Sequence, residues 1–502
     1  MKSSKTFFFY DLETSGFSAA NDRIMQFAGI RTDENFAKIG EPINLLVKLA
    51  DDILPSPEAI LVTKITPQKT QIDGLAEAEF AKYFTDEIAL PNTIFVGYNN
   101  VRFDDEFMRN FLWRNFRDPY EWSWKENRSR WDLLDVVRLT RALRPDGINW
   151  PFFEKDGVKI PTNNLVDLAR ENNFENTNAH DALADVEALI NVAKLLKEKQ
   201  PQMFDYLLKM CNKKEVSKLV NPENPQPFIY ASGRYSSEFE KTTAVLSLVS
   251  SSKPGAVLVW DLRVDPDNFN DLTEKEILEK ITANYKTRTE KDFIPLPVKE
   301  LSTNKCPAIA PLGTLDESAQ KRLNLSLEII EKNYNKLKKN RGLIDKIVAA
   351  FNARPEFAKK TDVENQLYDS FAPEADRAKI RVVAAADAND LADFHPNFID
   401  ERLTKLLLRY KARNFAKCLS AEEKKNYENY RAEKLNKNLP KYLETLRFLD
   451  AISRDEDPAD FANDAEKTEF YKLKKRMENR EIDNFILEEL QLWVESIWPE
   501  TA

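Results

Sequence analysis

The sequence has few cysteines and no long apolar run. Three cysteines occur in 502 residues, far apart along the chain and without metal-ligand spacing: Cys211, Cys306 and Cys418. So sparse a set argues against a disulfide framework and for a reducing cytoplasm. No apolar run reaches the 20 or so residues that a membrane-spanning helix needs. The apolar stretch 7–10 is interrupted by Asp11, too early for an export signal, so we expect a cytoplasmic protein with no membrane segment.

Acidic residues outnumber basic ones, 83 to 74, and histidine is scarce. The formal net charge is −9, which does not indicate nucleic-acid binding. It does not exclude such binding either, because the local electrostatic field of the binding groove determines it. Two histidines occur, His180 and His395, so a histidine inside a carboxylate motif is unlikely to be there by chance. Hydrophobic residues make up 42% of the chain, enough for several cores, and the length suggests three domains.

The first 200 residues predict an α/β domain. Apolar runs at 6–10, 24–31 and 93–98 predict strands, and apolar positions recurring every three or four residues predict helices over 77–88 and 181–196. Strands that alternate with helices imply a sheet flanked by helices. We place this domain at residues 1–200.

A proline-rich connector at 221–227 leads into a small β-rich domain, placed at residues 201–353. Strands are expected at 228–235, 242–250, 256–264 and 293–301, with a turn at 252–255 forming a hairpin. Thr273 and Glu276 form a capping-box pattern that predicts a helix to about Tyr285.

Glycine is absent after Gly342, and the remaining sequence is rich in Ala, Leu, Glu and Lys. Long helices favour these residues and need no turn glycine. We therefore expect an all-helical C-terminal domain over residues 354–502.

Acidic residues cluster at three places in the first domain. Asp11 and Glu13 end a strand on the same face, and oxygen ligands this close suit Mg²⁺ or Mn²⁺. The alternative is a strand that runs into a charged loop. Asp104 or Asp105 could instead cap a helix. Asp181 is a good N-cap that leaves Asp185 one turn inside the next helix, with His180 in the loop before it.

These three motifs resemble those of the DEDDh 3′→5′ exonucleases: D-x-E at 11–13, N-x-x-F-D at 100–104 and H-x-x-x-x-D at 180–185. The family pattern selects Asp104 over Asp105. Segments 97–149, 298–307 and 410–415 further resemble the bacterial exonuclease I family, and the resemblance extends to about residue 480. It implies a ribonuclease H-like exonuclease domain, an SH3-like middle domain and a helical C-terminal domain.

The resemblance also implies an activity. Such an enzyme hydrolyses single-stranded DNA from its 3′ end, releases 5′-mononucleotides, and serves DNA repair and recombination. Two Mg²⁺ ions, or Mn²⁺, would be held by Asp11, Glu13, Asp104 and Asp185, with His180 as the general base. A DEDDh nuclease acting on RNA ends or as a proofreader, and a catalytically silent module that only binds single strands, are the alternatives.

Cationic and aromatic residues interleave between Arg102 and Arg144, as a single-strand track requires. The predicted DNA contacts are Arg109, Tyr120, Trp124 and Arg138, with Glu13, Thr14 and Asn164 at the terminal nucleotide and Lys299 and Tyr368 in the outer domains. The basic stretch 402–417 is either a solvated helix face or a contact surface. The family resemblance implies a partner, the acidic tail of a single-stranded DNA-binding protein. We expect a monomer.

Overall fold

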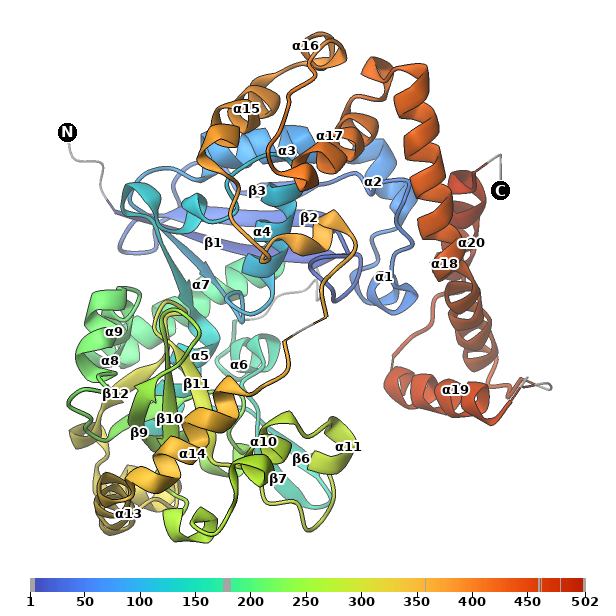
Figure 1. Ribbon diagram of the computed structural model, residues 1–502. Coiled ribbons are helices and arrows are strands. Elements are labelled where there is room, and N and C mark those ends of the chain that lie inside the picture. The colour runs from blue at the N-terminus through green and yellow to red at the C-terminus, as the bar shows by residue number, and fades with distance from the viewer. Residues whose placement is uncertain are drawn as a thin grey trace.

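The computed structural model describes residues 5–174, 182–356, 358–458, 461, 463–478 and 480–499. In Figure 1 the N-terminal region (blue to cyan) lies between the middle region, below it, and the C-terminal helices, above it and to its right. The cysteines are free thiols, in agreement with the sequence.

The N-terminal region contains a five-stranded sheet in the order β3-β2-β1-β4-β5. Strands β1, β2 and β3 are antiparallel, and β4 and β5 run parallel to β1. The strands are β1 (Thr6–Thr14), β2 (Ile24–Thr32), β3 (Ile43–Leu46), β4 (Thr93–Gly97) and β5 (Ser129–Asp132). The strand predictions for this region are therefore confirmed.

Helices cover both faces of the sheet because β1 is apolar on both faces. Phe7 and Phe9 pack toward Val186 and Leu189 of α7, while Phe8 on the other face belongs to a cluster with residues of α3 and α4. The helices are α1 (Pro57–Thr63), α2 (Pro67–Asp73), α3 (Glu77–Tyr83), α4 (Asp104–Arg114), α5 (Leu133–Leu143), α6 (Leu165–Glu171), α7 (Ala182–Lys199), α8 (Pro201–Lys209) and α9 (Lys213–Leu219). A π-helical turn, Phe84–Ile88, extends α3 over the predicted helix 77–88.

The middle region contains a second five-stranded sheet, antiparallel throughout, in the order β11-β10-β9-β8-β12. Its strands are β8 (Phe228–Ala231), β9 (Thr242–Ser250), β10 (Ala256–Asp261), β11 (Val298–Ser302) and β12 (Ile309–Pro311). A separate hairpin pairs β6 (Phe152–Lys155) with β7 (Val158–Pro161). Gly255 has φ +72°, as the predicted turn between β9 and β10 requires.

Three predicted strands in this region are too long. The first ends at Ala231 because Tyr235 N–H bonds to the Ser232 carbonyl and turns the chain. The strand predicted at 256–264 ends at Asp261, where the Val264 N–H bonds to the Asp261 carbonyl and turns the chain. The last begins at Val298, since Pro295 and Pro297 have no N–H to donate to a neighbouring strand. The helices of this region are α10 (Glu274–Thr282), α11 (Tyr285–Arg288), α12 (Glu317–Arg322), α13 (Leu327–Lys339) and α14 (Arg341–Asn352).

The described C-terminal region is helical, as the lack of glycine predicted. Its longest helix, α18, has 33 residues and begins with a capping box between Ser420 and Glu423. The helices are α15 (Glu374–Ala385), α16 (Ala388–Ala392), α17 (Glu401–Asn414), α18 (Ala421–Ser453), α19 (Asp464–Met477) and α20 (Asn484–Ile497).

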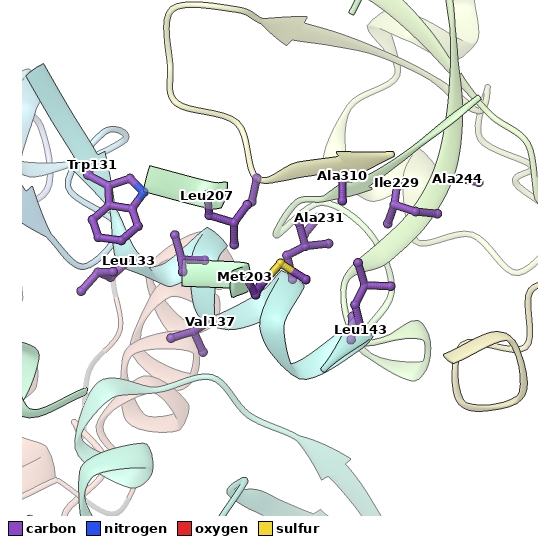
Figure 2. Packing of buried hydrophobic residues seen from close by; sticks show 14 of the residues in the cluster. Trp131, Leu133, Val137, Leu143, Met203, Leu207, Ile229, Ala231, Ala244 and Ala310 are labelled. Carbon is purple, nitrogen blue, oxygen red and sulfur yellow. The ribbon is translucent and has the colours of Figure 1, made fainter. Parts of the chain in front are cut away.

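The N-terminal and middle regions share one hydrophobic core. Figure 2 shows Leu143 of α5 and Met203 and Leu207 of α8 beside the β-sheet residues Ile229, Ala231 and Ala310, while Leu133 and Val137 of α5 lie on the side of Trp131; all of them belong to one buried cluster. The sheet of the middle region is thus closed on one side by helices of the N-terminal region.

A buried network of charges joins the C-terminal region to the N-terminal region. The carboxylate of Glu364, in the segment leading into α15, lies 2.6 Å from Arg23, 2.6 Å from Arg413 and 3.3 Å from Arg409. Arg413 also pairs with Asp52 at 2.7 Å. Each region therefore supplies charges that the other neutralises.

Candidate active site

Three carboxylates converge at the end of β1. Asp11 and Glu13 lie on one face of the strand, separated by the buried Leu12. Asp185 lies in the first turn of α7, which packs along β1. One oxygen from each of the three carboxylates lies within 4.8 Å of the others, close enough for a cation to be held between them.

Asp104 is not one of these three carboxylates, but it lies near enough for its charge to act on Asp11. It is the first residue of α4, directly after the loop that follows β4, and it is 5% exposed. Burial raises the pKa of Asp11 well above its usual range, and the charges of Asp104, Glu13 and Asp185 raise it further. Burial likewise raises the pKa of Asp104 to about 8, with Asp105 as the next cause. Such buried like charges favour protonation or a bound cation.

Asp105 is also buried, but its charge is already compensated. Its carboxylate accepts a hydrogen bond from the Tyr10 hydroxyl at 2.5 Å and another from the Arg130 guanidinium. Asn100 donates a third at 3.4 Å. Asp105 therefore connects β1, α4 and β5, and Asp104 is the carboxylate whose charge acts on Asp11.

His180, the predicted base, and Asp181, the predicted cap, lie outside the described residues. The described part of the helix begins at Ala182. Neither Asp104 nor Asp105 caps the helix. The N-cap position of α4 is Phe103, whose side chain makes no capping hydrogen bond.

A cavity of about 620 Å³ opens beside the carboxylates, lined by Asp11, Asp185, Arg138 and Asn164 among others. The Arg138 guanidinium donates to Asp135 at 2.6 Å, one turn before it on α5. Asn164 caps α6, its Oδ1 accepting from the Val166 and Asp167 amides. The structure thus brings two of the predicted DNA contacts to the carboxylate group.

Thr14 lies at the turn that follows the carboxylates. It is buried, and its hydroxyl donates to the Gly16 carbonyl at 2.7 Å. A Cβ on Gly16 would lie 2.4 Å from the Asp22 carboxylate, so any other residue there would have to displace the Asp22 side chain. These residues shape the backbone beside Glu13.

Three other predicted contacts form a second cluster. The guanidinium of Arg109 lies 5.7 Å from the ring centroid of Tyr120, and the Tyr120 and Tyr368 rings are 6.5 Å apart. Trp124 is 61% exposed, whereas the neighbouring tryptophans Trp113, Trp122 and Trp131 are buried. The dense tryptophans of the sequence are thus mainly core, and one is left for stacking.

Lys299 lies apart from both groups, in a polar cavity of about 200 Å³ between the N-terminal and middle regions. Its Nζ is 3.1 Å from the ring centroid of Tyr235. Further cations line the same cavity: Arg102, Arg234, Lys253 and Lys305. Asp132, Asp135 and Glu300 line it too, so the cavity has charges of both signs, with the cations in excess.

Raising the pH from 6 to 8 should weaken DNA binding at this cavity. Burial lowers the pKa of Lys299 to about 7, with Arg234 and Lys241 lowering it further and Asp261 opposing them. The side chain is therefore charged at pH 6 and largely neutral at pH 8, and the charged form attracts phosphate. We expect the affinity for single-stranded DNA to fall by about threefold to tenfold, measured by fluorescence anisotropy in EDTA.

Lys299→Met separates this effect from the titration of the carboxylates, which is common to both proteins. Methionine keeps the length of the side chain and removes its charge. The pH dependence of the variant should therefore be shallower than that of the unmodified chain. Equal profiles would exclude Lys299 from DNA binding.

The basic stretch 402–417 is neither a solvated face nor an open basic surface. Arg402 pairs with Asp400 at 2.7 Å, Lys411 with Glu423 at 2.6 Å, and Arg409 and Arg413 with carboxylates of the buried network. Within this stretch Lys405 and Lys417 are exposed. The acidic partners of Arg409 and Arg413 lie far away in the sequence, so these two cations could not be recognised as inward-facing from the sequence.

Models of three protein families match consecutive parts of the chain. The family described as Exonuclease matches residues 8–193, the Exonuclease I SH3-like domain 211–353, and the Exonuclease I C-terminal domain 361–497. Exodeoxyribonuclease I of Haemophilus influenzae is 40% identical over 445 residues, covering 88% of this chain and 93% of that protein. Its Escherichia coli counterpart is 40% identical over 451 residues, covering 89% and 94%.

The chain belongs to the exonuclease I family. Solved structures agree with this membership. E. coli exonuclease I in complex with a dA16 oligonucleotide has a TM-score of 0.88 at 36% identity, over 98% of this chain and 100% of that one. The zinc-bound form of the E. coli complex with single-stranded DNA also has a TM-score of 0.88 at 36% identity, over 99% and 100%.

The three-part fold expected from the family resemblance is confirmed: an exonuclease domain, an SH3-like domain and a helical C-terminal domain. The predicted ranges of the three domains, 1–200, 201–353 and 354–502, stay predictions. No helix among the described residues has the length and apolarity that would let it cross a membrane.

Proposed function

We propose that the chain is a 3′→5′ exodeoxyribonuclease that hydrolyses single-stranded DNA and releases 5′-mononucleotides. The observation that carries this proposal is the convergence of three carboxylates, with Asp104 near enough for its charge to act on Asp11, beside a cavity that also contains Arg138 and Asn164. The cluster of Arg109, Tyr120 and Tyr368 supplies the combination of charge and stacking that single strands need. Relatives named exodeoxyribonuclease I, and those solved with oligonucleotides, support the same substrate.

Two Mg²⁺ ions are the proposed cofactor, with Mn²⁺ as a substitute. Asp11, Glu13, Asp104 and Asp185 would hold them, because hard divalent cations prefer oxygen ligands. These carboxylates fit a pair of divalent cations. Burial and the charges of its acidic neighbours raise the pKa of Asp11, so its ionised form needs a cation beside it. When bound, the two ions would stabilise the attacking and the leaving oxygen of the phosphodiester.

The protein's own side chains then position the strand and accept the proton. Asn164 and Arg138 line the cavity beside the carboxylates, and Arg138 would offer a positive charge to the phosphate of the terminal nucleotide. Glu13 and Thr14, at the end of β1, would border the same nucleotide. His180 precedes Asp185 by five positions in the sequence. An imidazole there would accept the proton of the attacking water through a ring nitrogen, since its ordinary pKa is close to neutral.

A labelled oligonucleotide tests the proposal. A single strand labelled at its 3′ end should lose the label as a mononucleotide in Mg²⁺ and stay intact in EDTA. A strand that binds in Mg²⁺ without being shortened would favour the catalytically silent binding module instead. Release of internal fragments, or faster trimming of RNA, would also contradict the proposed activity.

Replacing His180 with alanine should lower single-turnover cleavage by about 10²–10⁴-fold, the usual contribution of a positioned general base. The KM for single-stranded DNA should change little, because the imidazole acts on the water. His395→Ala is the control, being the other histidine in the chain. An unchanged rate for the His180 variant would remove this residue from the mechanism.

We also propose that the protein acts as a monomer in cytoplasmic DNA repair, and that the acidic tail of a single-stranded DNA-binding protein docks on it. The inward-facing cations of 402–417 leave only Lys405 and Lys417 exposed there, so the docking site lies mainly outside this stretch. A labelled acidic peptide should therefore bind a Lys405→Ala/Lys417→Ala variant as tightly as it binds the unmodified chain.

A further inference from the structure

Glu106 contacts side chains from all three parts of the chain. It lies on α4, and its Oε1 accepts a hydrogen bond from Arg109 at 2.8 Å. Its Oε2 accepts a hydrogen bond from the hydroxyl of Tyr368, on the segment that leads into the C-terminal helices. Lys305, from the loop between β11 and β12, places its Nζ 4.0 Å from Oε1. One carboxylate therefore connects the exonuclease, SH3-like and helical domains.

The side chains that Glu106 holds are those predicted to bind DNA. Arg109 lies between Glu106 and the Tyr120 ring, and Tyr368 stands 58% exposed beside both. Tyrosine and arginine side chains have several rotamers, and a fixed acceptor removes this freedom before the strand arrives. The hydrogen bonds of Glu106 thus preorganise a stacking ring and a cation.

The charge of Glu106 has the opposite effect on binding. Its carboxylate is 23% exposed and lies beside groups that would meet a polyanion. A phosphate that approaches Arg109 must share this cation with a carboxylate already bonded to it. The net attraction is therefore weaker than that of an unpaired arginine.

We propose that Glu106 is a positioning residue that orients Arg109 and Tyr368 for the strand and at the same time limits how tightly they hold it. The inference rests on the proposed function, because it concerns the grip on single-stranded DNA. An enzyme that removes one nucleotide at a time must exchange each phosphate contact after every cleavage. A cation partly neutralised by its own neighbour exchanges phosphates faster than one that has no other partner.

Glu106→Gln separates the two effects, because glutamine keeps an acceptor oxygen and removes the charge. We expect this variant to bind an oligothymidylate in EDTA about threefold to tenfold more tightly at low salt. The slope of log affinity against log salt should steepen by about 0.7, the value of one further phosphate contact on a single strand. In Mg²⁺ both KM and kcat on a long strand should fall, since tighter holding slows the advance of the strand.

Two further variants complete the experiment. Tyr368→Phe keeps the ring and removes the hydroxyl that bonds to Glu106, so its KM should rise by about twofold to fivefold without a change in the salt slope. Glu469→Gln removes the same charge from an exposed pair with Lys472 on α19 and should leave binding and kinetics unchanged.

Binding by Glu106→Gln that is no tighter than that of the unmodified chain, with an equal salt slope, would overturn the inference. If this variant does not fold, a KM for Tyr368→Phe equal to that of the unmodified chain would overturn it as well. Failure of the proposed function looks different, because the unmodified chain itself would then leave the strand intact in Mg²⁺.

Discussion

Asp11→Asn should lower the cleavage of single-stranded DNA by at least about a thousandfold, or roughly 4 kcal/mol of transition-state stabilisation. Asp11 is the carboxylate whose pKa responds to all three of its acidic neighbours, so it lies at the centre of the group. Asparagine has the same shape and lacks the charge that holds a divalent cation. The strand itself is held by cations and rings elsewhere, and its affinity in EDTA should stay within about threefold.

The measurement is single-turnover cleavage at saturating Mg²⁺, together with anisotropy in EDTA. Asp86→Asn is the matched control, since Asp86 pairs with Lys82 on the surface of the same domain and should be dispensable for cleavage. In metal-free protein Asp11→Asn should also raise Tm, because it removes one of several buried like charges. Activity above about a hundredth of the original rate would place the metal elsewhere.

Glu364→Ala should lower the free energy of unfolding by about 3–5 kcal/mol, the usual cost of removing one partner of a buried ion pair. The carboxylate is the shared partner of Arg23, Arg409 and Arg413, and its loss leaves these guanidinium groups buried without it. Urea titration followed by far-ultraviolet circular dichroism measures the change. Glu374→Ala is the control, because the exposed pair of Glu374 with Arg377 contributes at most about 1 kcal/mol.

The effect of Glu364 has a defined pH dependence. Burial alone would raise its pKa, but Arg413 and Arg23 outweigh this and hold the pKa well below the usual range. A depressed carboxyl pKa stabilises the fold fully above the pKa of an unfolded glutamate, about 4.3, and the stabilisation is lost as the pH falls through the lowered value. The stability difference between the unmodified chain and Glu364→Ala should therefore be constant at neutral pH and shrink in acid. A loss below about 1 kcal/mol at pH 7 would show that the network does not join the domains.

The sequence predicted those parts of the structure that depend on local pattern. Alternation along β1 placed Asp11 and Glu13 on one face, and the lack of glycine after Gly342 indicated the C-terminal helices. The prediction for β11 was wrong in its first residues, although Pro295 and Pro297 were visible signals against it.

Features that depend on distant partners could not be predicted. Arg409 and Arg413 read as a basic stretch because Asp52 and Glu364 are remote in sequence. The choice between Asp104 and Asp105 came from the family pattern. The physical reason for this choice is that the carboxylate of Asp105 already accepts hydrogen bonds from Tyr10 and Arg130. These contacts exist only in the folded chain. The role of Glu106 could not be predicted, because its partners Tyr368 and Lys305 lie far away in the sequence.

The helix α5 packs simultaneously against its own domain and against the middle sheet. The predicted boundary near residue 200 therefore crosses a shared hydrophobic core, and we expect neither of the two domains to fold independently of the other. A protein that used the N-terminal domain alone would have to carry polar side chains at positions such as Leu143, Met203 and Leu207, which here lie in the core shared with the neighbouring sheet. The apolar residues of α5 thus need the middle domain to cover them from water, whatever that domain contributes to holding the strand.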